Sequence, residues 1–146
     1  MLKLNIGAGN LPQDGFTNHD LVKHRPEIDV SFDLNDELWP VDSDSYDEVE
    51  ANDVLEHLNN PLQAINEIHR ILKTGGIFTA KCCGWKNPNF WVDITHKKAF
   101  DVRSMDYLDP TTALGGEYVY YTDKKWKLLM AEEDRNHNPR FRLEKI

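Results

Sequence analysis

The sequence predicts an α/β domain built on a doubly wound, mostly parallel sheet, and three observations lead to this prediction. Short apolar runs alternate with helical stretches, which is typical of strands joined by crossover connections. A loop with glycines at positions 7, 9 and 15 directly follows the first apolar run. Residues 61–74 repeat apolar side chains at helical spacing. The length of 146 residues is that of one domain, so we expect residues 1–146 to form a single unit.

The first four strands are expected where short apolar or β-branched runs end at a polar residue. They are residues 3–6, 16–19, 29–32 and 46–51. The connection between the first two strands, residues 7–15, is short, because a parallel crossover that contains a helix needs about a dozen residues or more. We therefore expect the first crossover to be reduced to a turn.

Residues 61–74 form the best-defined predicted helix. Asn60 can cap it, Pro61 suits its first position, and Gln63 lies three residues after the cap. Gly75 and Gly76 are expected to end it. Its apolar stripe consists of Leu62, Ile65, Ile68, Ile71 and Leu72.

The last part of the chain is predicted to complete the sheet. A strand is expected at residues 77–82, and an irregular, aromatic-rich segment follows at residues 84–110. Residues 125–133 and 141–146 are predicted to form an antiparallel hairpin around a turn at 134–139. Cys82 and Cys83 are adjacent and no CxxC spacing exists, so we expect two reduced thiols and no metal site.

Charge and hydropathy narrow the classes of partner. The net charge is −8, and residues 1–60 carry 14 acidic and 3 basic side chains. Nucleic-acid binding is therefore not expected, because phosphate backbones need tracks of Lys and Arg, whereas a cationic ligand is compatible with this half. No apolar run approaches the roughly 20 residues of a membrane span, and no signal peptide is recognised. We expect a cytoplasmic protein without a membrane anchor.

Polar residues at predicted strand ends indicate a nucleoside-bearing cofactor. Ligands of open α/β sheets bind at the carboxyl ends of the strands. Gly7 and Gly9 let a ligand approach the backbone closely, and Asp20 offers two acceptor oxygens to ribose hydroxyls. Asp33 ends the third strand and is a candidate acceptor for an adenine amino group. Because GxGxxG and a helix for a pyrophosphate are missing, S-adenosylmethionine is favoured over a dinucleotide.

The motifs, taken in order, resemble those of class I (Rossmann-like) S-adenosylmethionine-dependent methyltransferases of the small-molecule and glycan type, the type 11-like domain. Residues 4–10 are similar to the first motif of that family, and residues 18–20 and 33–34 to its ribose and adenine segments. Residues 46–58 and 67–76 are similar to its fourth-strand block and the block that follows.

The resemblance implies a seven-stranded sheet of order 3-2-1-4-5-7-6 with strand 7 antiparallel. It also implies methyl transfer to a small-molecule or glycan acceptor. Two positions depart from the family pattern: Asn5 replaces the usual acidic residue before the first glycine, and Leu11 replaces the third glycine. The cofactor residues that the resemblance implies are Asn5, Gly7, Ala8, Gly9, Asp20, Asp33, Leu34, Asn52 and Asp53.

Three residues are candidates for catalysis or acceptor binding. Asp93 and His96 lie in the aromatic segment, and a spacing of three places both side chains on one face of a helical turn. We hypothesise that His96 is a base or an acceptor-binding group with Asp93 as its support. His57, just past the fourth strand, is the alternative.

The sequence also allows two other functions, and it suggests one oligomeric state. A cofactor-binding pseudoenzyme or regulatory subunit is the main alternative, since no separate acceptor domain is recognised. A nucleotide-dependent oxidoreductase is disfavoured by the absence of a phosphate-binding helix. The reduced first crossover leaves one sheet face exposed, and exposed apolar patches commonly mark association sites, so we expect a homodimer through that face.

Overall fold

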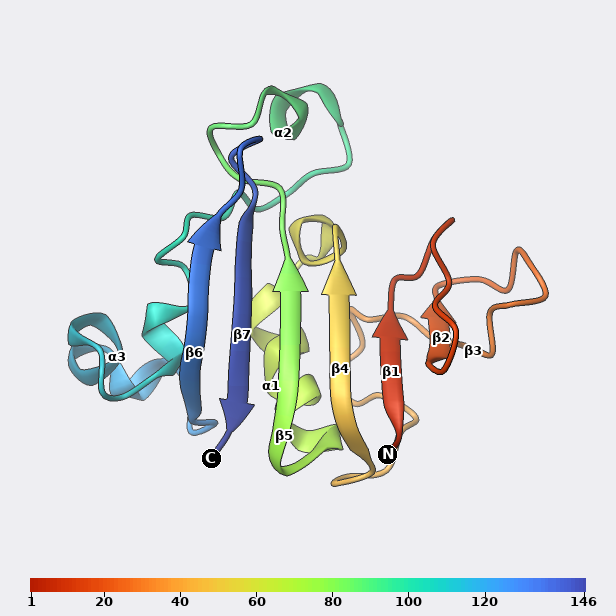
Figure 1. The fold of residues 1–146 in the computed structure, drawn as a ribbon, viewed down its shortest axis with the longest axis horizontal. Coiled ribbons are helices and arrows are strands. Elements are labelled where there is room, and N and C mark those ends of the chain that lie inside the picture. Colours follow the sequence, from red (N-terminus) through yellow and green to blue (C-terminus); the bar gives the residue numbers. More distant parts are fainter.

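Seven strands form one sheet in the order β3-β2-β1-β4-β5-β7-β6 in the computed structural model, which describes residues 1–146 (Figure 1). Strands β1 to β5 pair in parallel, and β7 runs antiparallel to both β5 and β6. The predicted strand order and directions are therefore confirmed. The strands are β1 Lys3–Ile6, β2 Thr17–Asp20, β3 Val30–Ser31, β4 Tyr46–Asn52, β5 Leu72–Lys81, β6 Trp126–Glu133 and β7 Pro139–Lys145.

One long helix, α1 (Pro61–Ile71), supports the sheet. As expected, Pro61 opens the helix, and the side chain of Asn60 accepts a hydrogen bond from the backbone N–H of Gln63 at 3.2 Å. The residues that α1 buries include Ala64, Ile65 and Ile68, which belong to the same core as the strand residues of the covered face. The other helical elements are short: η1 Leu55–His57, α2 Pro88–Val92, η2 Asp106–Leu108, α3 Ala113–Glu117 and η3 Val119–Tyr121.

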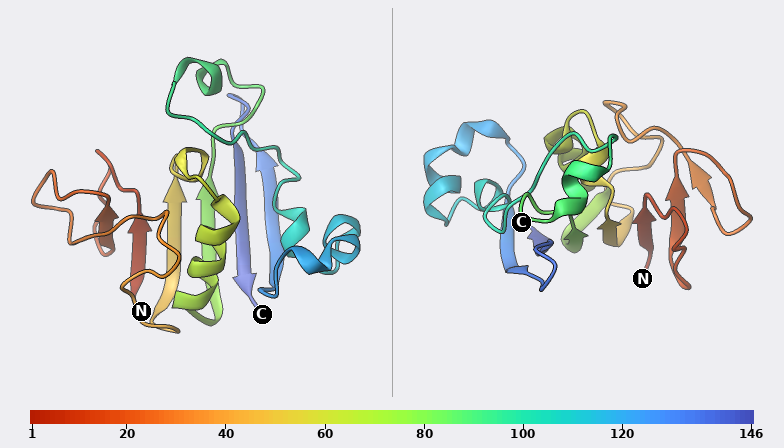
Figure 2. Two further views of the ribbon diagram at one scale, coloured as in Figure 1. Left: turned by 180° about the vertical axis from the view of Figure 1, so that it is seen from behind. Right: turned by 90° about the horizontal axis from the view of Figure 1, so that it is seen from above.

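The crossovers between β1, β2, β3 and β4 contain no helix. The predicted shortening of the first crossover is thus confirmed, and the next two are shortened as well. Figure 2 shows α1 on one face of the sheet and no helix on the other, which we call the open face. Residues 7–16 turn back beneath β1 and β2, where the buried Asn18 side chain accepts hydrogen bonds from Asn5 Nδ2 and Gln13 N.

The open face is polar, because alternate residues of each strand point to opposite sides and the apolar set points toward α1. Lys3 lies beside Glu48 in the ladder, and their side chains form an ion pair at 2.9 Å. Thr79 lies beside Arg142, which is exposed. The expected lack of helix cover on this face is therefore observed. Near β1 and β2, however, the 7–16 loop covers part of the face and buries Asn5 and Asn18, and many of the other side chains on the face are charged. The side chains of the open face include Lys3, Glu48, Glu50, Thr79, Lys81, Arg140 and Arg142.

The predicted boundary between α1 and β5 was wrong by several residues. The helix ends at Ile71, and β5 begins at Leu72 instead of residue 77. The backbone N–H groups of Asp44 and Ser45 bind the last helical carbonyls, those of Arg70 and Ile71, at 3.0 and 2.8 Å. These donors replace a glycine cap. The two glycines lie instead inside β5, where the register with β4 shifts and Gly75 has φ +78°.

The C-terminal hairpin is confirmed, with β7 beginning at Pro139, two residues earlier than expected. Its turn is held by hydrogen bonds between the backbones of Asp134 and Asn138, at 3.0 Å, and of His137 and Asp134, at 2.9 Å. β3 is shorter than expected and comprises only Val30 and Ser31.

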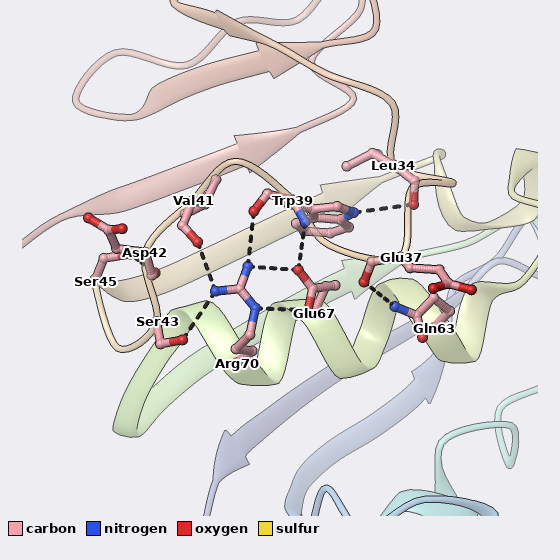
Figure 3. A network of polar contacts seen from close by, with 10 residues as sticks. All are labelled: Leu34, Glu37, Trp39, Val41, Asp42, Ser43, Ser45, Gln63, Glu67 and Arg70. Atoms are coloured by element: carbon pink, nitrogen blue, oxygen red, sulfur yellow. Dashed lines mark hydrogen bonds and ion pairs between the residues drawn. The ribbon is translucent and has the colours of Figure 1, made fainter.

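A polar network fixes the 39–45 loop to α1 (Figure 3). Arg70 donates to both carboxylate oxygens of Glu67, at 2.8 and 2.7 Å, and to the carbonyl oxygens of Trp39 and Val41. Glu67 also accepts the backbone N–H of Trp39 at 2.8 Å. Burial opposes ionisation of Glu67, yet the hydrogen bonds from Arg70 and Trp39 outweigh it and lower the pKa of this carboxyl. The loop that replaces the third crossover helix is thereby anchored.

Candidate functional site

A cavity of about 320 Å³ lies at the carboxyl ends of β1, β2 and β4. This is the edge at which open α/β sheets bind ligands. The cavity is lined by six of the nine sequence-predicted cofactor residues and by one predicted catalytic residue. These are Gly7, Gly9, Asp20, Asp33, Leu34 and Asp53, together with His57.

The glycine loop forms one wall of the cavity. Gly7 has φ +64°, and a Cβ atom on it would lie 2.4 Å from Cγ2 of Val54, another lining residue. Gly9 also has a positive φ, of +53°, and donates its backbone N–H to Oδ2 of Asp20 at 2.8 Å. Only glycine satisfies the conformation and the spacing at position 7. No helix follows the loop, so no helix N-terminus is offered to a pyrophosphate.

Asp20 joins the ends of β1 and β2 at the cavity. Its two oxygens accept the backbone N–H groups of Gly9, at 2.8 Å, and Leu21, at 2.7 Å. An ionised carboxylate offers about four acceptor positions, so about two remain for the hydroxyl groups of a ligand. Asp33 similarly accepts from the backbone and the side chain of Asn35 through Oδ1, and its Oδ2 has no hydrogen bond.

His19 is a buried support for the loop that the sequence analysis did not assign to the site. Its Nε2 lies 2.9 Å from the carbonyl oxygen of Phe32, so this nitrogen carries the proton of the neutral ring. Nδ1 is then free to accept the backbone N–H of Gly7 at 3.3 Å. Burial lowers the pKa of His19, which favours this neutral form. The signal in the sequence was its position next to Asp20.

Three predicted cofactor residues do not line the cavity. The side chain of Asn5 donates to Asn18 Oδ1 at 3.0 Å and to the Leu11 carbonyl at 3.3 Å, so it holds the loop from below. Ala8 is buried, and its backbone N–H donates to the carbonyl oxygen of His19. Asn52 is paired with Lys81 in the sheet, and its amide lies 3.4 Å from Glu50. Each of them therefore supports the loop or the sheet around the cavity.

Asp53 terminates β4 in an unusual backbone conformation. Its φ is +55°, which is uncommon for a residue with a Cβ atom, and its carboxylate forms an ion pair with Lys81 at 2.7 Å. Asp20, Asp33 and Asp53 together make the rim acidic, which suits a ligand with a positive charge.

The three predicted catalytic residues come together beside this cavity. One nitrogen each of His57 and His96 and one oxygen of Asp93 lie within 4.8 Å of one another. The ring centroids of the two histidines are 4.7 Å apart, and Nε2 of His96 lies 3.6 Å from Oδ2 of Asp93. We call this group the His57–Asp93–His96 cluster. His57 belongs both to the cluster and to the cavity wall, so the cluster adjoins the cavity.

Thr95, which the sequence analysis missed, connects two members of the cluster. Its hydroxyl donates to Oδ1 of Asp93 at 2.6 Å and lies 2.9 Å from Nδ1 of His57. A hydroxyl has one proton, so His57 must donate from Nδ1 to the Thr95 oxygen. Hydrogen bonds from the Thr95 side chain and backbone lower the pKa of Asp93. The side chain of His96 donates from Nδ1 to the carbonyl oxygen of Phe90 at 3.0 Å.

Glu56 anchors the segment that carries Asp93 and His96. Its side chain is fully buried and accepts the backbone N–H of Cys83 at 2.9 Å, while its carbonyl oxygen accepts those of Lys97 and Lys98. Burial raises the pKa of the Glu56 carboxyl, and its Oε2 has no hydrogen-bond partner. The adjacent Cys82 and Cys83 are buried free thiols, as expected from the sequence.

Comparison with known proteins gives a match to a family model over part of the chain and a shared fold over the whole of it. Residues 17–80 match the profile of a methyltransferase domain family. No curated protein matches the chain by sequence. None of the helices has the length and apolar character that crossing a membrane requires.

The whole chain superposes on solved structures that share little sequence with it. An S-adenosylmethionine-dependent methyltransferase from Thermotoga maritima gives a TM-score of 0.67 at 13% identity, covering 99% of this chain and 82% of that chain. A Haloferax volcanii methyltransferase, solved with the Trm112 methyltransferase activator, gives 0.66 at 15% identity, with 99% and 82% covered. One from Mesorhizobium loti gives 0.64 at 11% identity, with 99% and 90% covered.

Proposed function

We propose that the chain is a class I, Rossmann-like methyltransferase domain of the S-adenosylmethionine-dependent kind and that it methylates a small-molecule or glycan acceptor. Residues 17–80 match a methyltransferase domain family, and the chain shares the fold of solved methyltransferases. The observation that carries the proposal is the shared position of His57. This residue lines the cavity in which the cofactor residues meet, and it also belongs to the cluster with Asp93 and His96.

The residues of the cavity fit S-adenosylmethionine. Gly7 and Gly9 present a wall without Cβ atoms, and Asp20 has acceptor positions left for both ribose hydroxyls. Asp33 is placed one strand further along, where we assign it to the adenine amino group, and Leu34 adds an apolar contact. The acidic rim favours a ligand whose sulfonium is positively charged. That sulfonium supplies the reactive methyl group and a good leaving group.

The His57–Asp93–His96 cluster is the acceptor-binding group of this proposal. Methyl transfer is an in-line displacement, so much of the catalysis comes from positioning the acceptor atom and excluding water. Nδ1 of His57 is bound to Thr95 and Nδ1 of His96 to Phe90, which fixes both rings. Phe90 stacks on His96 at 5.3 Å and shields it. His57 is the only member of the cluster that lines the cavity proposed for the cofactor.

The proposal is tested by incubating the purified protein with methyl-labelled S-adenosylmethionine and a fractionated cell extract, followed by mass spectrometry of the labelled products. A labelled small molecule or glycan is expected, and both Asp20→Ala and His96→Asn should abolish most of the label. Label in a protein or nucleic acid alone would contradict the acceptor class.

A cofactor-binding subunit is the second candidate, and the loss of three crossover helices favours it. One structural neighbour was solved with an activator protein, which shows that a partner can accompany this fold. On this alternative, the purified protein would bind S-adenosylhomocysteine yet label nothing until a partner is added.

We propose that two copies of the chain associate through the open face. We also propose a cytoplasmic location, because both cysteines are buried free thiols. The open face carries Glu48 and Glu50 on β4 and Arg140 and Arg142 on β7, and Lys3 already pairs with Glu48. A two-fold axis between these strands would set acid against base in both directions. Light scattering should give a dimer that dissociates at high salt or in Arg140→Glu/Arg142→Glu. A monomer at low salt would refute it.

A further inference from the structure

The His57–Asp93–His96 cluster has the arrangement of a metal site. In each of its side chains one polar atom is held by a neighbour while another has no hydrogen bond. Thr95 binds Oδ1 of Asp93 through both its backbone N–H and its hydroxyl, and Oδ2 is left without a hydrogen bond. Metal-binding groups in proteins are commonly fixed in this way, by a second hydrogen bond that orients the ligand.

The two histidines repeat the pattern. Nδ1 of His57 is bound to the Thr95 hydroxyl, and Nδ1 of His96 donates to the Phe90 carbonyl oxygen. In the neutral rings both Nε2 atoms therefore carry lone pairs. Nε2 of His96 faces Oδ2 of Asp93 at 3.6 Å, so two acceptors point at each other. A cation between them removes this conflict, and that cation is either a proton on His96 or a metal ion.

From this geometry we propose that His57, Asp93 and His96 bind one divalent transition-metal ion of the Zn²⁺ class. Two imidazoles and one carboxylate are a known catalytic ligand set for zinc, with the remaining position open. Metal–ligand bonds of about 2.0–2.2 Å require ligand atoms roughly 3–3.5 Å apart. The Asp93–His96 separation of 3.6 Å is slightly longer than this range, and the cluster as a whole, within 4.8 Å, must contract around the ion.

The open position would face the cavity, because His57 lines it. It would receive an oxygen atom of the acceptor and hold it toward the cofactor. This role rests on the proposed function, whereas binding of the ion does not. No part of the cavity wall other than His57 belongs to the metal site, so binding of S-adenosylhomocysteine reports separately on the cofactor site.

The test is Zn²⁺ binding to the metal-free protein, measured by calorimetry and by competition with a chromophoric chelator. One Zn²⁺ per chain is expected. His96→Ala and Asp93→Asn should weaken binding by about 100-fold or more, and Thr95→Val by about 10- to 100-fold, as for other residues that orient ligands. Co²⁺ should give an absorption spectrum of a four- or five-coordinate site.

The matched control is His137→Ala, which removes the histidine of an exposed pair with Glu133, held at 2.7 Å. It should leave the tight Zn²⁺ site unchanged. Equal Zn²⁺ affinity in His96→Ala, Asp93→Asn and the original chain would overturn the proposal, as would loss of the tight site in His137→Ala. If His96→Ala fails to bind S-adenosylhomocysteine because it has not folded, Asp93→Asn decides, because the Asp93 side chain is 45% exposed and its replacement disturbs the fold less.

Discussion

Gly7 faces Val54 so closely that any side chain at position 7 would collide with it, since a Cβ atom there would lie 2.4 Å from Cγ2 of Val54. We expect Gly7→Ala to lower the free energy of unfolding by about 1–2 kcal/mol through its positive φ and by about 1–3 kcal/mol more through overpacking. Urea denaturation measures both. Gly15→Ala, where φ is +81° and nothing lies within 4 Å, should show the first cost alone. Adding Val54→Ala to Gly7→Ala should remove the part of the stability loss that overpacking causes. If the loss stays the same, the contact between positions 7 and 54 is disproved.

Asp20→Ala should weaken binding of S-adenosylhomocysteine by about 1.5–3 kcal/mol, the range for hydrogen bonds to a charged group. The ribose loses its acceptors, and the backbone N–H groups of Gly9 and Leu21 lose theirs. Calorimetry measures the change. Asp14→Ala is the control, because Asp14 is exposed and lies in the same loop as Gly9. Equal affinities in the two variants would remove Asp20 from the cofactor site.

His96→Asn should lower turnover by about 10²-fold or more, the contribution of a positioned catalytic group. Affinity for S-adenosylhomocysteine should stay nearly the same, because His96 does not line the cavity. His137→Asn serves as the control for activity. Full activity in His96→Asn would move the role to His57, and loss of cofactor binding would show that His96 instead orders the segment after α2.

Arg70→Met should destabilise the fold by about 3 kcal/mol, because it leaves the buried Glu67 carboxylate without its main partner. Adding Glu67→Gln should recover part of this loss, since glutamine still accepts the Trp39 N–H and carries no charge. Chemical denaturation of the four proteins of this cycle gives the coupling energy. Additive losses would show that the pair is not coupled.

Stability should fall as the pH is lowered below about 6.5, and His19 should account for part of the fall. Burial lowers the pKa of His19 in the folded chain, so the unfolded chain takes up a proton first and unfolding is favoured at acidic pH. Above that range the contribution is fully present. His19→Asn should show a smaller loss between pH 7.5 and 5.5 in urea denaturation. Parallel curves for the two proteins would exclude His19.

The sequence was sufficient to predict the location of site residues that directly follow a strand. Gly7, Gly9 and Asp20 follow neighbouring strands, and parallel strands bring their carboxyl ends to one edge. For the same reason His57, after β4, lies near the segment that follows β5, where Asp93 and His96 are found. The strand order therefore predicts that His57, Asp93 and His96 lie close together, but it does not predict the direction in which each side chain points.

Features that depend on side-chain direction or on distant donors were not predictable. Asn5 does not line the cavity because its side chain is bonded to Asn18 and to the carbonyl oxygen of Leu11, and the path of the 7–16 loop that creates this contact is not evident from the sequence. The end of α1 depends on Asp44 and Ser45, which precede the helix by more than a dozen residues. Thr95 bonds to both Asp93 and His57 because the segment after α2 packs against η1, and the sequence alone does not reveal this packing.

Glu56 and His57 are consecutive residues, so the cavity and the segment that carries His96 are linked through the backbone. The carbonyl oxygen of Glu56 holds Lys97 and Lys98, while His57 borders the cavity. If a ligand in the cavity restrains η1 (Leu55–His57), the hydrogen bonds to the Glu56 carbonyl oxygen will also restrain the residues around His96. Such linkage is reciprocal: if cofactor tightens acceptor binding by some factor, the acceptor tightens cofactor binding by the same factor. The two sites would thus share one free energy of interaction, and its value is the same whichever ligand binds first.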